Sequence, residues 1–406
     1  MRTLALVAGF LCISIVLFDA FQTIILPRRA TGRFRLTRLF YIATWFPWRF
    51  FARRFHHPRR REILLGYYGP LSLIFLLVVW AAGMVLGFAL IYYAIGSPFI
   101  DPAQPSNFRT DLYVSGTTLF TLGLGDVTPH SPLARVLLIF ESGMGFGFLA
   151  IVMGYFPVLY SAFSRREVSI SLLDARAGSP PTAAELMRRH SCDGAAHSLS
   201  TLLVEWERWS AELLESHISY PLLCYFRSQH NSQSWLSALT AILDTSSLLI
   251  AGVRGLEARQ AQLTFAMARH ALVDLSQIFN LRPVPNAPDG DAPDRLPPAR
   301  CRELYDLLTA VGIQLCCDES SRERLRQMRA LYEPYAETLS RFLIMPLPQW
   351  FALQPRKDNW QTVARLRAQT EAPDSANPDP ANPIPTPPTT DATIAASALL
   401  DRSHDF

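Results

Sequence analysis

The chain has 406 residues, of which 50% are hydrophobic and 18% are charged. It is too apolar for a typical soluble protein and too polar for one that is embedded wholly in a membrane. The net charge of +4 is small, and we expect no nucleic-acid partner. The six cysteines lack metal-ligand spacing, so neither a zinc site nor a structural disulfide is predicted. The apolar residues concentrate in residues 1–165, so we predict a membrane half followed by a cytosolic half.

The first apolar stretch, Leu4 to Leu26, is long enough to span a bilayer. A signal peptide is the alternative, but no small-residue cleavage site follows the stretch. The next segment is strongly basic and contains no acidic residue before Glu62; its arginines are Arg28, Arg29, Arg33, Arg35, Arg38, Arg49, Arg53, Arg54, Arg59, Arg60 and Arg61. By the positive-inside rule this segment is cytoplasmic, which places the N-terminus outside. Asp19, in the inner part of the first span, is expected to reach one of these arginines in a structural role.

Residues Leu39 to Phe51 combine aromatic side chains with arginines. This mixture is typical of an interfacial segment that lies on the inner leaflet, where the arginines attract anionic lipid. A basic loop that only fixes the topology would explain the charge but not the aromatic residues. We therefore expect membrane lipid as a partner of this segment.

A second span is predicted from Pro70 to Ile95 and a third from Leu133 to Phe163, the latter projecting into the cytosol. With the N-terminus outside, the first span carries the chain inward and the second carries it outward again, so residues 96–132 are predicted to lie outside. No span carries arginines at every third position, so nothing indicates a voltage sensor. The predicted segments are 1–64 (first span and basic loop), 65–165 (membrane core), 166–370 (cytosolic domain) and 371–406 (tail).

Residues 118–126, which lie in the outer segment, read Thr-Leu-Phe-Thr-Leu-Gly-Leu-Gly-Asp. This string resembles the pore-loop signature of potassium channels, T-x-x-T-x-G-x-G-D. Glycines at alternate positions permit backbone conformations that turn successive carbonyls toward one axis, where they replace the water around a cation. A glycine-rich turn between two membrane helices is the alternative. Arginine bias and motif position agree, because a pore loop must enter from outside.

The resemblance implies an all-α membrane protein with three transmembrane helices, a short re-entrant pore helix between Arg109 and Phe120, and a selectivity filter. It also implies a homotetramer, because each chain supplies one quarter of the filter. The filter residues would be Thr121, Leu122, Gly123, Leu124, Gly125 and Asp126. Carbonyls of the first four would coordinate K⁺, and the Thr121 hydroxyl would lie at the inner end. Gly125 would give the strand its conformation, and Asp126 would brace the outer mouth.

The sequence departs from the commonest family filter at Leu124, where tyrosine or phenylalanine is usual. An aromatic side chain there braces the filter laterally, so its absence leaves strict potassium selectivity open while retaining a pore. A non-selective cation channel is the alternative that follows from this substitution.

Three features of the third span are candidates for gating or support. Gly145 matches the position of the family's inner-helix hinge, although glycines in membranes also let helices approach closely. Pro157 is expected to loosen the same helix, and Phe156 with Tyr160 is a candidate apolar constriction. Glu141 is an ionisable residue at membrane depth, and its offset from Asp126 favours a brace behind the pore loop over a pore-lining position.

Helical periodicity predicts an all-helical cytosolic domain, with a proline-rich break at 282–298. The predicted helices are Leu199 to Leu214, Leu256 to Phe279, Arg300 to Cys316 and Arg322 to Leu343. Ala238 to Val253 is apolar but short and contains Asp244, so we predict a buried core helix there. The proline-rich residues 371–406 are expected to be disordered.

No nucleotide-binding, EF-hand or catalytic pattern is found, so we predict neither a cofactor nor an enzyme. The aromatic residues Trp206, Trp209, Trp235 and Tyr220, with His217 and His230, are typical of a core, and the ligand of this domain is unknown. We interpret the chain as a passive, potassium-permeable channel of a bacterial inner membrane. The alternative of another class is a membrane-anchored sensor or scaffold whose pore does not conduct.

Overall fold

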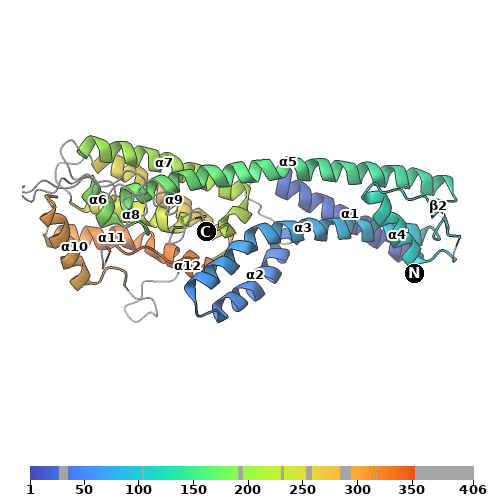
Figure 1. The fold of residues 1–406 in the computed structure, drawn as a ribbon, viewed down its shortest axis with the longest axis horizontal. Coiled ribbons are helices and arrows are strands. Elements are labelled where there is room, and N and C mark those ends of the chain that lie inside the picture. The colour runs from blue at the N-terminus through green and yellow to red at the C-terminus, as the bar shows by residue number, and fades with distance from the viewer. Residues whose placement is uncertain are drawn as a thin grey trace, which may run out of the picture. The chain divides into compact units, whose positions relative to one another are not determined.

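The computed structural model describes residues 1–26, 35–102, 105–190, 195–229, 233–252, 258–283, 294–313, 315–316 and 318–352. Within these residues the fold is almost wholly helical (Figure 1), which confirms the all-α prediction. The tail at 371–406 and most of the proline-rich break, 284–293, lie outside the described residues, as do Cys192, His230 and Cys317.

Four helices in the described part of the chain are long and apolar enough to cross a membrane. They are α1 (Arg2–Ala20), which continues as the π-helical turn η1 (Phe21–Ile25), α3 (Pro58–Ala94), α5 (Pro132–Ala177) and α8 (Trp235–Gly252). The apolar window of α8 is 89% buried within the chain, whereas that of α5 is 11% buried. Burial of α8 among α7 (Ala195–Ser219), α9 (Ala258–Ile278) and α11 (Glu319–Ala330) agrees with the core helix predicted for residues 238–253.

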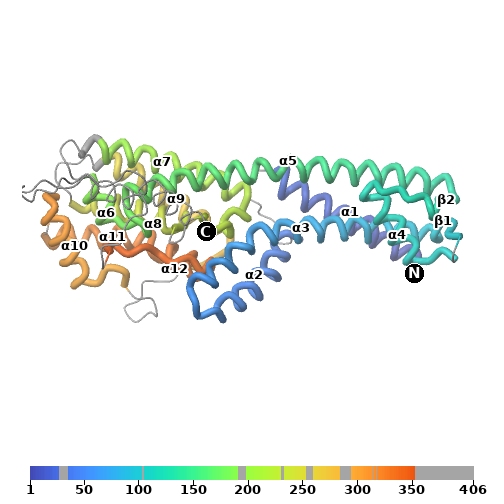
Figure 2. Tube along the Cα trace, in the orientation of Figure 1, coloured from blue at the N-terminus to red at the C-terminus, as the bar shows by residue number. Residues whose placement is uncertain are grey.

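Both α3 and α5 are longer than the predicted spans. At 1.5 Å per residue, their 37 and 46 residues give lengths of about 55 Å and about 69 Å, against a hydrocarbon core of about 30 Å. The α3 helix begins twelve residues before the expected Pro70, and α5 continues past Phe163 to Ala177. As a result α5 crosses the expected domain boundary at 165/166 without a break and leads directly to the helices that follow it (Figure 2).

Glycines allow α1 to pack closely on α3. A Cβ atom added to Gly9 of α1 would lie 2.6 Å from the Gly87 carbonyl oxygen of α3, and one added to Gly87 would lie 2.5 Å from Ile13. Between them, Cys12 donates its thiol to the Gly83 carbonyl at 3.3 Å. Close backbone approach of this kind is a common way for helices to associate in membranes.

Residues 96–132 form a short helix and two short strands. Strand β1 (Phe99–Ile100) pairs antiparallel with β2 (Thr128–Pro129), with Phe99 opposite Pro129. Helix α4 (Phe108–Leu119) lies between these strands in the sequence and packs against α3 and α5. It occupies the place expected for the pore helix.

The part of the described chain that follows α5 consists of helices around α8 and α9. Besides α7, α8, α9 and α11, it contains α6 (Ala183–Arg189), the 3₁₀ turn η2 (Pro221–Tyr225), α10 (Pro298–Ala310) and α12 (Glu333–Leu343). The single helix predicted for residues 322–343 is wrong, because the chain breaks into α11 and α12. Pro334 explains the break, since proline is tolerated in the first turn of a helix but not in its interior. Helix α10 also ends six residues before the predicted Cys316.

An aromatic cluster joins α2 and α3 to the helices that follow α5. Trp45 of α2 (Leu36–Arg54) packs on Tyr68 of α3 and on Tyr225 of η2, with ring centroids 4.7 Å and 4.9 Å apart. Its indole nitrogen donates to the Phe342 carbonyl of α12 at 3.3 Å. On α5, the buried guanidinium of Arg166 donates to the carbonyls of Leu223 and Phe226.

Candidate ion pore

The residues after α4 have an alternating backbone conformation. Thr121, Gly123 and Gly125 have φ values of +56°, +55° and +77°, whereas the intervening Leu122 and Leu124 do not have positive φ. In an ordinary strand successive carbonyls point to opposite sides; a left-handed conformation at every second residue instead turns them toward one side. A Cβ atom at Gly123 or Gly125 would meet nothing within 4 Å in this chain. These positions therefore favour glycine for its conformation, because left-handed φ is costly for other residues.

Helix α4 ends immediately before this segment. Its N-terminus carries a capping box, in which the Asn107 side chain accepts from the Arg109 and Thr110 amides. Its C-terminal carbonyls precede Thr121, and the C-terminal end of a helix carries a partial negative charge that favours a cation nearby. The chain thus places a row of carbonyls and a helix end together, which is an arrangement suited to a dehydrated cation. No group of three His, Cys, Asp or Glu side chains in the described residues could hold a metal ion.

The predicted filter residues 121–126 are all exposed in the single chain. The side chains of Leu122 and Leu124 are 63% and 65% exposed, although both are apolar. The described residues of their own chain leave these side chains open to another molecule.

Asp126 is fixed to α4 from the outer end of the segment. The Tyr113 hydroxyl, on the outward half of α4, donates to Asp126 Oδ2 at 2.7 Å. This bond joins the middle of α4 to the end of the predicted filter. The bond ties position 126 to α4, and the role of Asp126 in bracing the mouth of a filter stays a prediction.

Glu141 is fully buried and lies behind α4. The Tyr92 hydroxyl of α3 donates to its Oε2 atom at 2.6 Å, and Ser115 Oγ of α4 lies 2.5 Å from its Oε1 atom. Ser115 Oγ is also 3.0 Å from the Val85 carbonyl. One carboxyl group therefore connects α3, α4 and α5 on the side of α4 away from solvent. This position is that of a brace behind the loop, the option favoured by its offset in the sequence.

Gly145 lies against the end of α4. A Cβ atom at this position would be only 2.0 Å from the Leu119 carbonyl oxygen and 2.8 Å from its carbonyl carbon. The neighbouring Gly143 and Gly147 have nothing within 4 Å of the same point. The structure thus gives Gly145 a packing role directly before the predicted filter, while its role as a hinge stays a prediction.

Comparison with known proteins matches residues 77–161 to a family model described as ion channel. Protein LctB of Bacillus caldotenax is 34% identical over 93 residues, which are 20% of this chain and 69% of LctB. LctB of Geobacillus stearothermophilus is 33% identical over the same length.

The chain belongs to this ion channel family. The resemblance read from residues 118–126 is thereby confirmed. The uncharacterized membrane protein YdjJ of Bacillus subtilis is also similar, being 27% identical over 184 residues. This match covers 45% of the chain and 52% of YdjJ, so the chain spans about half the length of that relative. No solved structure matches the chain significantly.

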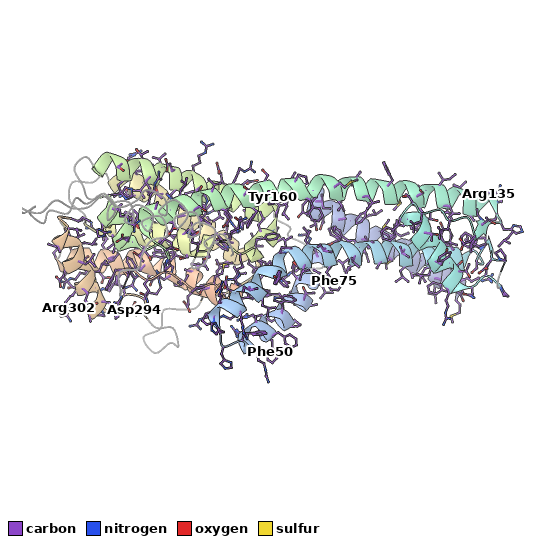
Figure 3. All side chains as sticks on the ribbon, viewed as in Figure 1. Phe50, Phe75, Arg135, Tyr160, Asp294 and Arg302 are labelled. Carbon is purple, nitrogen blue, oxygen red and sulfur yellow. The ribbon has the colours of Figure 1, made fainter. Side chains whose placement is uncertain are left out.

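Helix α5 has a long apolar surface that the described residues of its own chain do not cover. Ile139, Phe146, Met153 and Tyr160 are 75%, 68%, 67% and 68% exposed. Tyr160 marks this surface near the cytosolic end of the membrane part (Figure 3). Phe156 is 40% exposed, and the helix continues through Pro157. The structure therefore leaves the candidate constriction residues accessible to a partner or a pore, and their role in gating stays a prediction.

Asp19 lies close enough to Arg35 of the following segment to interact with its charge, and it also has hydrogen-bond partners that the sequence did not indicate. Its carboxylate accepts from the Thr37 amide at 3.1 Å, from the Thr37 hydroxyl at 2.5 Å and from the Trp80 indole at 3.0 Å. Arg35, in the segment that follows α1, donates to Thr23. Asp19 thus ties the first turn of α2 to α1 and α3, which is a structural role.

Sequence reasoning missed the polar partners of the pore loop. Tyr92, Tyr113 and Ser115 have no distinguishing pattern in the sequence, and only their contacts distinguish them. Glu141 carried the available signal, because a carboxyl group at membrane depth requires polar neighbours. The pairing of β1 with β2 had no detectable signal, since each strand has two residues.

Proposed function

We propose that the chain forms a homotetrameric, potassium-permeable cation channel in which ions move passively down their electrochemical gradient. The observation that carries this proposal is the alternation of left-handed φ at Thr121, Gly123 and Gly125 at the end of α4. Four such segments around one axis would form rings of carbonyls from Thr121, Leu122, Gly123 and Leu124. Such rings replace the hydration shell of a permeant cation.

The tetramer is supported by what one chain leaves exposed. A single segment cannot enclose an ion, and irregular backbone at membrane depth is tolerated only when it is buried in protein or lines a wet cavity. The exposed Leu122 and Leu124 and the apolar surface of α5 give three neighbouring subunits a surface to cover.

We propose an inner-membrane location with the N-terminus outside. The support is the arginine-rich segment between α1 and α3, together with the outer position that this topology gives to the predicted filter. The long cytosolic extension of α5 then connects the pore to α6–α12.

The first test is the bi-ionic reversal potential of the purified full-length protein in planar bilayers, with potassium on one side and sodium on the other. A reversal near the potassium limit supports a selective filter despite Leu124. Clear current that reverses near zero makes the protein a non-selective cation channel. Absence of current from protein shown to be tetrameric and inserted favours the non-conducting scaffold.

Gly123→Ala separates conduction from scaffolding. Left-handed φ costs a residue with a Cβ atom about 1–2 kcal/mol, so the variant filter should conduct poorly. Gly143→Ala is the matched control, because a Cβ atom there meets nothing within 4 Å and the backbone is an ordinary helix. Equal currents from both variants would contradict the assignment of the filter.

A further inference from the structure

Helix α5 has two different faces in the part that follows Tyr160. The buried face includes Arg166 and Ile170, which are 3% and 2% exposed. On the other face lie Val168 and Leu172, which are 57% and 55% exposed. We call these two residues the distal stripe of α5. Residues four apart are neighbours on the surface of a helix, so the two aliphatic side chains form one apolar surface.

The contacts of the buried face fix the direction of the distal stripe. The Arg166 guanidinium donates to the carbonyls of Leu223 and Phe226 at 2.9 Å and 3.0 Å. From α7, Trp209 donates its indole nitrogen to the Arg166 carbonyl at 3.4 Å. Because this part of α5 cannot rotate without breaking these bonds, the distal stripe faces away from the described residues of its own chain.

The distal stripe lies beyond the reach of the bilayer. Val168 is 36 residues after Pro132, at which α5 begins, or about 54 Å along the helix, whereas a hydrocarbon core is about 30 Å thick. Beside the stripe, Arg176 of α5 pairs with Glu205 of α7 at 2.8 Å, and these side chains are 39% and 55% exposed. Exposed charges are costly in hydrocarbon and ordinary in water. Lipid acyl chains therefore do not cover the distal stripe.

The distal stripe continues the long apolar surface of α5 along one unbroken helix (Figure 1). The exposed members of that surface follow one another at seven-residue intervals, as Ile139, Phe146, Met153 and Tyr160. Seven residues are slightly less than two turns, so each interval shifts the direction by about 20°. The eight residues from Tyr160 to Val168 reverse this shift, and Val168 returns to within about 20° of the direction of Ile139. A molecule that covers the earlier surface is therefore placed to cover the distal stripe too.

This arrangement favours a second copy of the chain as the partner of the distal stripe. In the proposed homotetramer the four α5 helices run in the same direction around one axis, so symmetry brings Val168 of every subunit to the same level. Identical apolar residues at one level pack against each other in parallel helix bundles. The exposed Arg165 lies about 60° around the helix from Val168, so its long side chain can extend from the edge of such a contact into water.

We propose that Val168 and Leu172 pack against the same residues of neighbouring subunits, so that the part of α5 after Tyr160 forms a parallel four-helix bundle beyond the membrane. The bundle is a subunit contact separate from the predicted filter, and it holds the four α5 helices together directly after the candidate constriction. This inference rests on the proposed homotetramer. It depends neither on ion conduction nor on potassium selectivity.

Contact between the stripes is tested by cross-linking the full-length protein in membranes. Val168→Cys and the matched control Val204→Cys, at a 51% exposed position of α7, each add one thiol to the native cysteines. A short reagent with two maleimide groups should convert most of the Val168→Cys protein to covalent dimers, and it should leave Val204→Cys and the unmodified protein mainly monomeric on a denaturing gel. Dimers that are no more abundant from Val168→Cys than from Val204→Cys would overturn the proposal.

The contribution of the bundle to assembly is tested by diluting the full-length protein in detergent and measuring the mass of the complex. A variant with both Val168→Asp and Leu172→Asp buries unpaired charges at the contact, so the protein concentration at which the complex dissociates should rise by roughly tenfold or more. The control combines Val204→Asp with Leu263→Asp, at positions 51% and 45% exposed, and should dissociate like the unmodified protein.

The two proposals give different results in this experiment. An unmodified tetramer whose stripe variant dissociates no more readily than the control would overturn the bundle and leave the channel proposal standing. An unmodified protein that is monomeric at every concentration would contradict the homotetramer, and the bundle with it.

Discussion

Tyr92 and Glu141 are joined by a hydrogen bond of 2.6 Å between α3 and α5, directly behind the pore helix. The bond is buried, and Ser115 of α4 lies against the other carboxyl oxygen. Three helices therefore meet at one side chain, and the position of α4 depends on it.

Tyr92→Phe removes the donor of this bond and leaves a buried carboxyl oxygen without it. We expect the free energy of unfolding to fall by about 1–3 kcal/mol, the usual cost of an unsatisfied buried polar group. Unfolding in a detergent titration measures this change. Tyr93→Phe is the control, because Tyr93 is 40% exposed and keeps its ring contact with Phe108. Equal stability of both variants would show that the brace is not required.

Gly145→Ala places a methyl group 2.0 Å from the Leu119 carbonyl oxygen. The helices must separate at the end of α4, so we expect a loss of stability of about 1–3 kcal/mol and a loss of current. Gly147→Ala should leave both nearly unchanged. A Gly145→Ala protein of normal stability that fails only to open would favour the hinge role over packing.

Tyr113→Phe frees the Asp126 carboxylate from α4 by removing its 2.7 Å hydrogen bond. The outer end of the filter should then be less firmly held, and single-channel recordings should show shorter open periods. The side chain is exposed, so we expect little change in the stability of the folded protein. Unaltered openings would mean that Asp126 is held by other groups in the assembled channel.

His217 on α7 predicts how stability depends on pH. Burial, together with the nearby Arg166 guanidinium, holds the pKa of this imidazole well below 6.5. Its Nδ1 atom lies 2.8 Å from the Leu213 carbonyl, and its Nε2 atom lies 3.2 Å from Arg166 Nη1. A neutral ring that donates from Nδ1 and accepts at Nε2 satisfies both contacts.

Below pH 6.5 the unfolded chain takes up a proton at residue 217 that the folded chain does not accept. Stability from this group is therefore fully present above pH 6.5 and falls by about 1.4 kcal/mol per pH unit below it. Thermal unfolding of the full-length protein, followed by tryptophan fluorescence from pH 7.5 to 5, measures the slope. His217→Gln should reduce the slope in this range, and an unchanged slope would show that other groups cause it.

Among the helices that follow α5, we expect the loss of a buried ion pair to lower the free energy of unfolding far more than the loss of an exposed one. Arg295 Nη2 lies 2.5 Å from Asp244 Oδ2 of the enclosed helix α8, and the Tyr332 hydroxyl donates to Asp244 Oδ1. Asp244→Ala should destabilise the protein by about 3–5 kcal/mol, because it removes one partner of a buried pair. Glu212→Ala breaks the exposed pair with Arg208 and should cost less than about 1 kcal/mol. Chemical unfolding of both variants compares them directly.

The sequence predicted the membrane helices and the location of the pore loop because these depend on local properties. Span length follows from hydropathy, and the alternation of glycines at 123 and 125 is visible in the chain as written. The hydropathy pattern predicted the wrong helix ends where a helix continues beyond its apolar segment. Residues 58–69 and 164–177 continue α3 and α5 because these helices also pack against others, α2 and η2 for α3 and α6, α7 and α8 for α5, and hydropathy carries no information about such packing.

Partners distant in sequence were decided by the tertiary structure alone. The sequence indicated an arginine of the following segment as a partner of Asp19 but not its hydrogen bonds to Thr37 and Trp80, which form because the fold brings α3 beside the junction of α1 and α2. In the same way, Gly145 could be a hinge or a packing position on its sequence alone. The 2.0 Å distance between a Cβ atom added at Gly145 and the Leu119 carbonyl oxygen follows from how α4 packs on α5.

By itself, then, the sequence determined that this chain crosses a membrane and carries a pore-loop motif, because apolar length and glycine spacing act within one segment. Tertiary structure decided what holds that motif. In the sequence Tyr113 and Tyr92 are ordinary helix residues, and folding places their hydroxyls 2.7 Å from Asp126 and 2.6 Å from Glu141. A hydrogen bond across 13 or 49 residues depends on the path of the backbone between its partners, and that path is set by the packing of whole helices.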